Sequence, residues 1–84
     1  MICSKDIWDI IQAKMLRGRW VSLEEIYQMV EKHWNLDAED FYPQSHTSDI
    51  PKWKRNVRNV LQYRKNTGEI LWNREARYLL PQTR

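Results

Sequence analysis

The sequence has a single cysteine, Cys3, and only two glycines among its 84 residues. One thiol cannot form an intramolecular disulfide, so we expect no disulfide framework and a reduced, cytoplasmic setting. Two glycines cannot build a phosphate-binding loop, and no serine lies in a glycine-flanked nucleophile elbow. Uninterrupted apolar runs are two or three residues long, far shorter than a transmembrane helix requires. These absences argue against a P-loop protein, a serine hydrolase and a membrane-spanning chain.

Metal-binding and catalytic patterns are also lacking. His33 and His46 are thirteen positions apart, and nothing has the spacing of a zinc site. We predict that His33 is a partly buried structural histidine and that His46 is at most a weak candidate for a phosphate or base contact. The acidic residues at positions 37, 39 and 40 are better explained by a solvated loop or helix start than by a metal site. We therefore expect no enzymatic activity, no catalytic residues, no metal and no cofactor.

Charge is divided unevenly along the chain. Residues 1–49 hold five Lys/Arg against nine Asp/Glu, whereas residues 50–84 hold nine against two, although the net charge is only +3. Nucleic acid is the commonest partner for such a basic segment, but many basic helix faces are merely solvated. The length suits one small domain, residues 1–84, whose five Trp, four Tyr and one Phe would supply much of the core.

The basic half begins with a segment, residues 50–68, that is typical of one amphipathic helix. At roughly 100° per residue, its apolar residues fall on one side. The exceptional position is Arg64, which lies within the apolar stripe, so we expect its stem on the core and its guanidinium near water or the last helical carbonyls. Gly68 predicts a left-handed end to the helix. The predicted buried residues are Trp53, Val57, Val60 and Leu61.

The opposite side of this helix combines cations, which suit phosphate, with amides, which can read base edges. We predict that one set of its residues enters the major groove of DNA: Lys52, Arg55, Arg58, Asn59 and Gln62. We predict that a second set holds phosphates on either side of that helix: Lys54, Lys65, Arg74 and Arg77. Tyr63 and Trp72 could stack on bases, although aromatics at these spacings are more often packing residues.

Two further helices are expected in the acidic half. Residues 4–16 form an apolar stripe, with Ser4 as a possible cap and Arg17-Gly18 as the end. Residues 19–21 favour a short stub of strand. Ser22 and Glu25 have the spacing of a capping box, which predicts a helix from there to about residue 34.

The remainder is less regular. Residues 37–40 could form one helical turn pinned on the core by Leu36 and Phe41, and the polar loop 44–49 offers caps for the following helix. This long connection is either functional or a tolerated insertion. Residues 69–73 and 76–80 alternate as two strands. The sequence therefore predicts a mainly α fold with a small β-hairpin, in the order of a winged helix-turn-helix with three helices plus wing.

Three stretches resemble the N-terminal winged-helix domains of Mrr-type restriction endonucleases. SLEEIYQMVEKHWNLDAEDF is similar to that family's second helix and following turn, PKWKRNVRNVLQYRKNTGEI to its recognition helix, and ARYLLP to its second wing strand. The chain departs from the pattern at Asn59 and Arg64, where the family prefers apolar residues, and in lacking a wing glycine at positions 74–77.

The resemblance implies a DNA-targeting module of a prokaryotic restriction or defence protein. It also implies a nuclease in a C-terminal domain or a separate subunit, outside these residues. Double-stranded DNA is the expected partner, and no membrane is involved. The alternative is a winged helix that binds proteins, with its exposed Trp and Tyr as anchors.

Overall fold

The computed structural model describes residues 2–43 and 50–81, and it is mostly helical with one small antiparallel sheet. The elements follow one another in the order that the sequence predicts. They are α1 (Ser4–Lys14), β1 (Trp20–Ser22), α2 (Leu23–His33), the 3-10 helix η1 (Ala38–Phe41), α3 (Lys52–Thr67), β2 (Leu71–Trp72) and β3 (Arg77–Leu79).

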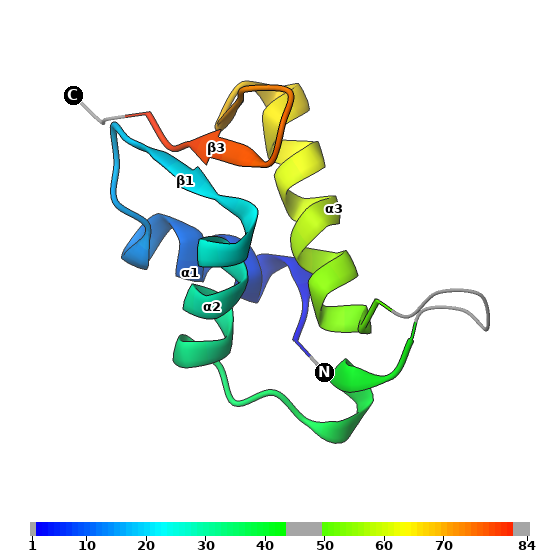
Figure 1. Ribbon diagram of the computed structural model, residues 1–84. Helices are drawn as coiled ribbons and strands as arrows, with labels where there is room; N and C mark the ends of the chain where they lie inside the picture. The colour runs from blue at the N-terminus through cyan, green and yellow to red at the C-terminus, as the bar shows by residue number, and fades with distance from the viewer. Residues whose placement is uncertain (1, 44–49, 82–84) are drawn as a thin grey trace.

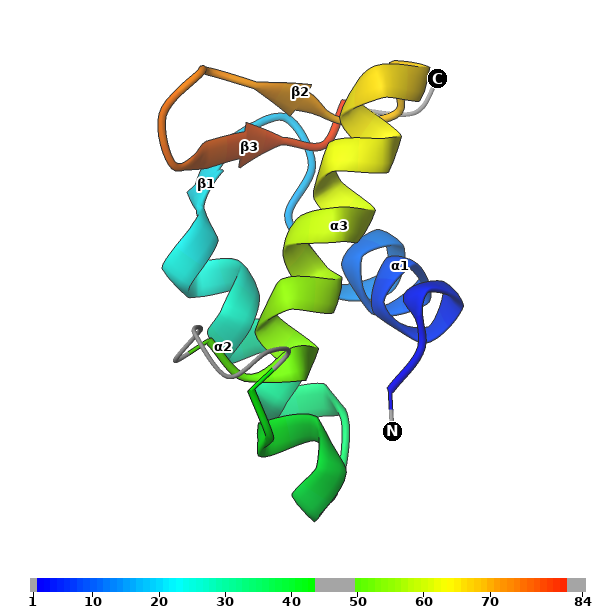
Figure 2. The same cartoon turned by 90° about the vertical axis from the view of Figure 1, so that its right-hand side faces the viewer.

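The long helix α3 runs along one side of the molecule in the view of Figure 1, and it packs against α1 and η1. Turning the molecule by 90° shows that the β2–β3 hairpin and α1 lie on opposite sides of α3 (Figure 2). The strand order is β1-β3-β2, so the predicted strand stub joins the hairpin as a third strand. Trp20 pairs with Leu79 and Leu71 pairs with the same residue from the other side.

The apolar stripe of α3 is confirmed as the centre of the core. Trp53, Val57, Val60 and Leu61 are buried, together with residues from α1, α2 and the sheet. Trp53 meets the ring of Tyr27 from α2 edge-on, with ring centroids 5.7 Å apart. This contact places the opposite, polar side of α3 in solvent.

The capping box of α2 forms as predicted. The Glu25 backbone N–H donates to the Ser22 hydroxyl at 3.2 Å, and the Ser22 N–H donates to the Glu25 carboxylate at 3.3 Å. These two bonds satisfy backbone donors that the helix itself cannot pair.

The predicted first residue of α1, Ser4, is confirmed, but its predicted cap is wrong and its predicted end is two residues too late. Cys3 is the cap, with its thiol donating to the Asp6 carboxylate at 2.9 Å. The helix ends at Lys14, and the positive φ of Gly18, 77°, serves the turn toward β1 instead.

The turn at residues 38–41 forms, with Leu36 packed on the core and the half-exposed Phe41 ring against the buried ring of Trp53, at a centroid distance of 6.5 Å. The complete burial of Asp40 was not predicted. Asp40 accepts hydrogen bonds from the backbone N–H groups of Ile2 at 2.9 Å and Asp37 at 3.0 Å. A buried carboxylate is tolerated here because backbone donors replace its water.

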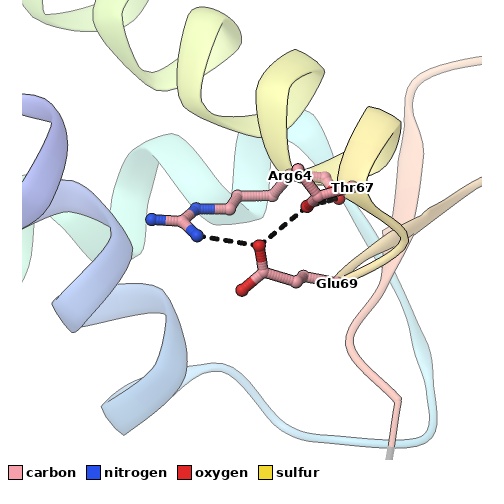
Figure 3. A network of polar contacts seen from close by, with 3 residues as sticks. All are labelled: Arg64, Thr67 and Glu69. Carbon is pink, nitrogen blue, oxygen red and sulfur yellow. Dashed lines mark hydrogen bonds and ion pairs between the residues drawn. The ribbon is translucent and has the colours of Figure 1, made fainter.

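Arg64 lies within the apolar stripe, and its charged group contacts an aromatic ring and a carboxylate. Its guanidinium carbon lies 4.7 Å from the ring centroid of Trp8, and its Nη1 donates to Glu69 at 2.8 Å (Figure 3). The Thr67 hydroxyl donates to the same carboxylate oxygen at 2.7 Å. The hydrogen bond from Arg64, followed by that from Thr67, lowers the pKa of Glu69. The predicted contact of this guanidinium with the last carbonyls is thus replaced by one with Glu69, while Gly68 closes α3 at a φ of 82° as expected.

The start of α3 has no side-chain cap, because Pro51 occupies the cap position. The Lys52 N–H instead donates to the Tyr42 carbonyl at 2.8 Å, which brings the two ends of the long connection together. The predicted caps in the 44–49 loop, and His46, lie outside the described residues.

Replacing the buried Asp40 tests its structural role. We expect Asp40→Ala to lower the free energy of unfolding by about 1–3 kcal/mol, because two backbone donors lose their acceptor. Urea denaturation measures this, with Glu39→Ala, an exposed acid of the same turn, as the matched control. Equal stability of the two variants would show that the bonds to Asp40 contribute nothing net.

Candidate nucleic-acid interface

A groove with a volume of about 530 Å³ lies between α3, the β2–β3 hairpin and the first residue of α2. One wall consists of residues that the sequence predicts to enter a DNA groove. These are Arg55, Arg58, Asn59 and Gln62. All four are exposed, since they lie opposite the buried stripe of α3. The structure therefore brings together four of the five residues predicted to read bases.

On the other wall, the sequence singles out only Trp72, as a residue that could stack on bases. This wall consists of Leu23, Trp72, Glu75, Ala76 and Tyr78. The alternation of side chains along β3 predicts that Tyr78 and Leu80 point to the same face of the sheet. Only the strand register shows that Tyr78 pairs with Trp72. The two walls differ in chemistry, because one carries guanidinium and amide groups and the other is largely aromatic and aliphatic.

Arg58 acts electrostatically on two phenols beside the groove. Burial raises the pKa of Tyr27 and of Tyr78 above their ordinary value, and the positive charge of Arg58 partly opposes that rise. Both hydroxyls therefore remain protonated at neutral pH. Tyr78, in the groove wall, can donate a hydrogen bond to an acceptor that Arg58 also attracts.

Lys54 and Lys65 contact aromatic rings. The Lys54 ammonium lies 5.1 Å from the ring centroid of Tyr27, and the Lys65 ammonium lies 4.6 Å from that of Trp72. These cation–π contacts hold both charges on the side of α3 that faces α2 and the sheet. Both lysines therefore lie on one side of α3, and Arg74 and Arg77, the other residues predicted to hold phosphates, lie in the hairpin.

The remaining predicted residues lie outside the groove. Lys52 is the half-buried first residue of α3 and does not line it. Arg74 is exposed in the β2–β3 turn with a positive φ of 68°. Arg77 precedes Tyr78 in β3, and since neighbouring strand residues point to opposite faces, it faces away from the groove. The structure therefore does not bring Arg77 to the other predicted residues.

Glu75 is the one acidic residue among the described residues that line the groove. Its position is fixed by the turn, in which the Asn73 side-chain oxygen accepts from the N–H groups of Glu75 at 2.8 Å and Arg77 at 3.3 Å. The Trp72 indole N–H donates to the Glu75 carbonyl. The Glu75 backbone is thereby fixed in the wall that faces Arg55 and Arg58, and its carboxylate opposes a second negative charge in this groove.

No other chemistry is evident in the described part of the chain. His33 is exposed rather than partly buried, because it lies at the end of α2 beyond the apolar stripe. Residues 2–43 and 50–81 contain no cluster of three or more metal-ligating side chains. None of the helices in those ranges is long and apolar enough to cross a bilayer.

Comparison of the chain with protein-family models, curated proteins and solved structures gave no match. The geometry of the groove and the chemistry of its lining are therefore the basis for a functional proposal.

The hairpin turn offers a test of how the groove wall is held. We expect Asn73→Ala to speed amide hydrogen exchange at Glu75 and Arg77 by roughly two- to tenfold, because each amide loses a hydrogen bond worth about 0.5–1.5 kcal/mol. Exchange measured by NMR checks this, with Asn66→Ala on exposed α3 as the control. Unchanged exchange in Asn73→Ala would mean that other contacts hold the turn.

Proposed function

We propose that the chain is a winged-helix DNA-binding module, with α3 as its recognition helix and the β2–β3 hairpin as its wing. The observation that carries the proposal is the groove, where Arg55, Arg58, Asn59 and Gln62 converge from one exposed helix face. Among the described residues, neither of these arginines takes part in an ion pair. Their charges are therefore available to an anionic partner.

The hydrogen-bonding groups of these side chains, as well as their charge, suit double-stranded DNA. Arginine makes bidentate bonds to guanine, and asparagine or glutamine makes them to adenine, along the major-groove edge. An α-helix is about 10–12 Å across and the major groove is about 12 Å wide, so α3 fits it. Arg74 in the wing and Lys65 near the end of α3 supply phosphate contacts on the wing side.

The biological setting follows from the sequence resemblance. We propose that this module targets DNA for a cytoplasmic prokaryotic restriction or defence protein of the Mrr type. The nuclease would lie in a C-terminal domain or in a separate subunit, and this module itself would have no catalytic activity.

A protein-binding winged helix is the second candidate, and a different surface favours it. Trp20, Leu79 and Leu71 pair across the three strands on the face of the sheet that points away from the groove. Trp20 is 40% exposed and Leu71 is 47% exposed. Such a row of large apolar side chains suits an anchor for another protein.

Removing the two groove arginines tests the first candidate. We expect Arg55→Ala combined with Arg58→Ala to weaken binding to a labelled random duplex by about tenfold or more, since two contacts to phosphate or base are lost. Fluorescence anisotropy at several salt concentrations measures affinity and its salt slope. The fold should persist, because both side chains are exposed.

The control removes the same charge from elsewhere, with Lys14→Ala combined with Lys32→Ala, both exposed and neither in the groove. Affinity that falls steeply with salt supports phosphate contacts, whereas a protein-binding module held by apolar anchors would bind its partner with little salt dependence. An arginine variant that binds as well as the control would remove α3 from the interface. A wild-type chain that does not bind at low salt would contradict the proposal.

Glu75 gives a prediction of opposite sign. Glu75→Gln should tighten binding to random duplex by roughly two- to fivefold at low salt, because a carboxylate in the groove repels phosphate. Glu31→Gln, on the exposed side of α2, changes the net charge equally and should have a smaller effect. Equal gains from both substitutions would indicate that only net charge matters and that Glu75 does not face the DNA.

A further inference from the structure

A second hollow lies on the side of α3 that faces α1. Its volume is about 440 Å³, and it is lined by Ser4, Lys5, Asn59, Val60, Tyr63 and Arg64. Figure 2 shows that α1 and the β2–β3 hairpin flank α3 from opposite sides, and the linings place this hollow beside α1 and the groove beside the hairpin. The sequence predicts a DNA contact for Asn59 and considers Tyr63 for base stacking, but no residue of α1 belongs to the predicted interface.

The cations of the proposed interface are unevenly placed around α3. Lys54 is held against Tyr27 of α2, Lys65 is held against Trp72 of β2, and Arg74 lies in the hairpin turn. A helix in the major groove, however, has a phosphodiester strand along each flank, since the groove is only about 12 Å wide. The strand on the wing side has cations opposite it, and the strand on the α1 side needs partners of its own.

The hollow beside α1 offers those partners. Lys5 is exposed and, within the part of the chain that the structure describes, makes no ion pair. Its acidic neighbour Asp6 accepts hydrogen bonds from the Cys3 N–H and thiol, which are the main cause of the lowered pKa of Asp6. The carboxylate is thus committed to the Cys3 cap, and the Lys5 ammonium remains open to another anion.

The other lining residues suit the same ligand. Tyr63 is 61% exposed, so its hydroxyl can donate to a phosphate oxygen while its ring contacts deoxyribose. Ser4 is exposed and adds a second hydroxyl. Arg64 contributes less, because its guanidinium is stacked on Trp8 and bonded to Glu69.

The hollow and the groove share one lining residue, Asn59 of α3. We propose that the DNA-binding surface extends across α3 onto the start of α1, where Lys5, Tyr63 and Ser4 contact the phosphodiester strand on the side of the major groove opposite the wing. This inference rests on the proposed function and adds a second backbone site to it. The domain then contacts the phosphates of both DNA strands that border the major groove.

The salt dependence of binding tests this, because each phosphate contact changes the slope of log affinity against log salt by about 0.9. Wild type, Lys5→Ala, Lys5→Arg and Lys14→Ala are each titrated with a random duplex over a range of salt. Lys14 is the matched control, since it lies in the last turn of the same helix and is also exposed. Thermal melting followed by circular dichroism establishes that every variant is folded.

We expect Lys5→Ala to lower the slope by about one and to weaken low-salt binding by roughly three- to tenfold, with Lys5→Arg and Lys14→Ala close to wild type. Tyr63→Phe, which removes only the hydroxyl, should weaken binding by roughly two- to fivefold without changing the slope. A Lys5→Ala slope equal to that of Lys14→Ala would overturn the α1 contact, while steep salt dependence of the wild type would still uphold the proposed function. A wild-type chain that does not bind duplex would overturn both.

Discussion

Trp53 packs between the edge of Tyr27 in α2 and that of Phe41 in η1, with ring centroids 5.7 Å and 6.5 Å away. It begins the buried stripe that continues through Val57, Val60 and Leu61. Since side chains on a helix have fixed angular positions, this packing sets the rotation of α3 about its axis. The outward direction of the groove arginines and amides follows from it, as does the position of both hollows.

Aromatic side chains also position much of the charge around α3. Lys54, Lys65 and Arg64 each lie over a ring, contributed by α2, β2 and α1 respectively. In an 84-residue chain with five Trp and four Tyr, such contacts bury aromatic area while leaving the cationic groups hydrated. Cations held by rings have fewer positions to sample, so less conformational entropy remains to be lost when an anion binds. The groove arginines and Lys5 are not held in this way.

The proposed interface contains groups that attract phosphate and one group that repels it. Arg55 and Arg58 attract an anion, while Glu75, whose backbone N–H is bonded to the Asn73 side chain, places a carboxylate in the lining of the same groove. A carboxylate penalises phosphate but accepts hydrogen bonds from the amino groups of cytosine and adenine. A carboxylate beside the two arginines therefore lowers the affinity for every DNA sequence. Discrimination between sequences then depends on the contacts with bases. Selectivity in this module would therefore depend on the hairpin as well as on α3.

The sequence by itself determined the helices and their buried sides. Apolar periodicity located α2 and α3, the Ser22–Glu25 capping box fixed one start, and Gly68 fixed one end. The exposed residues of the groove wall on α3 followed from the same periodicity, because a helix wheel requires only local geometry.

Tertiary structure alone decided the remainder. The burial of Asp40 depends on the Ile2 N–H, which is thirty-eight residues away along the chain. Strand register decides that Tyr78 faces the groove and that Arg77 faces away from it. A hydrogen bond from the Glu75 N–H to the Asn73 side chain fixes the position of Glu75 in the turn. The contacts of Lys54 and Lys65 with aromatic rings depend on residues of other elements. These contacts join residues distant in sequence, and a periodic pattern carries no information about which distant residues will meet.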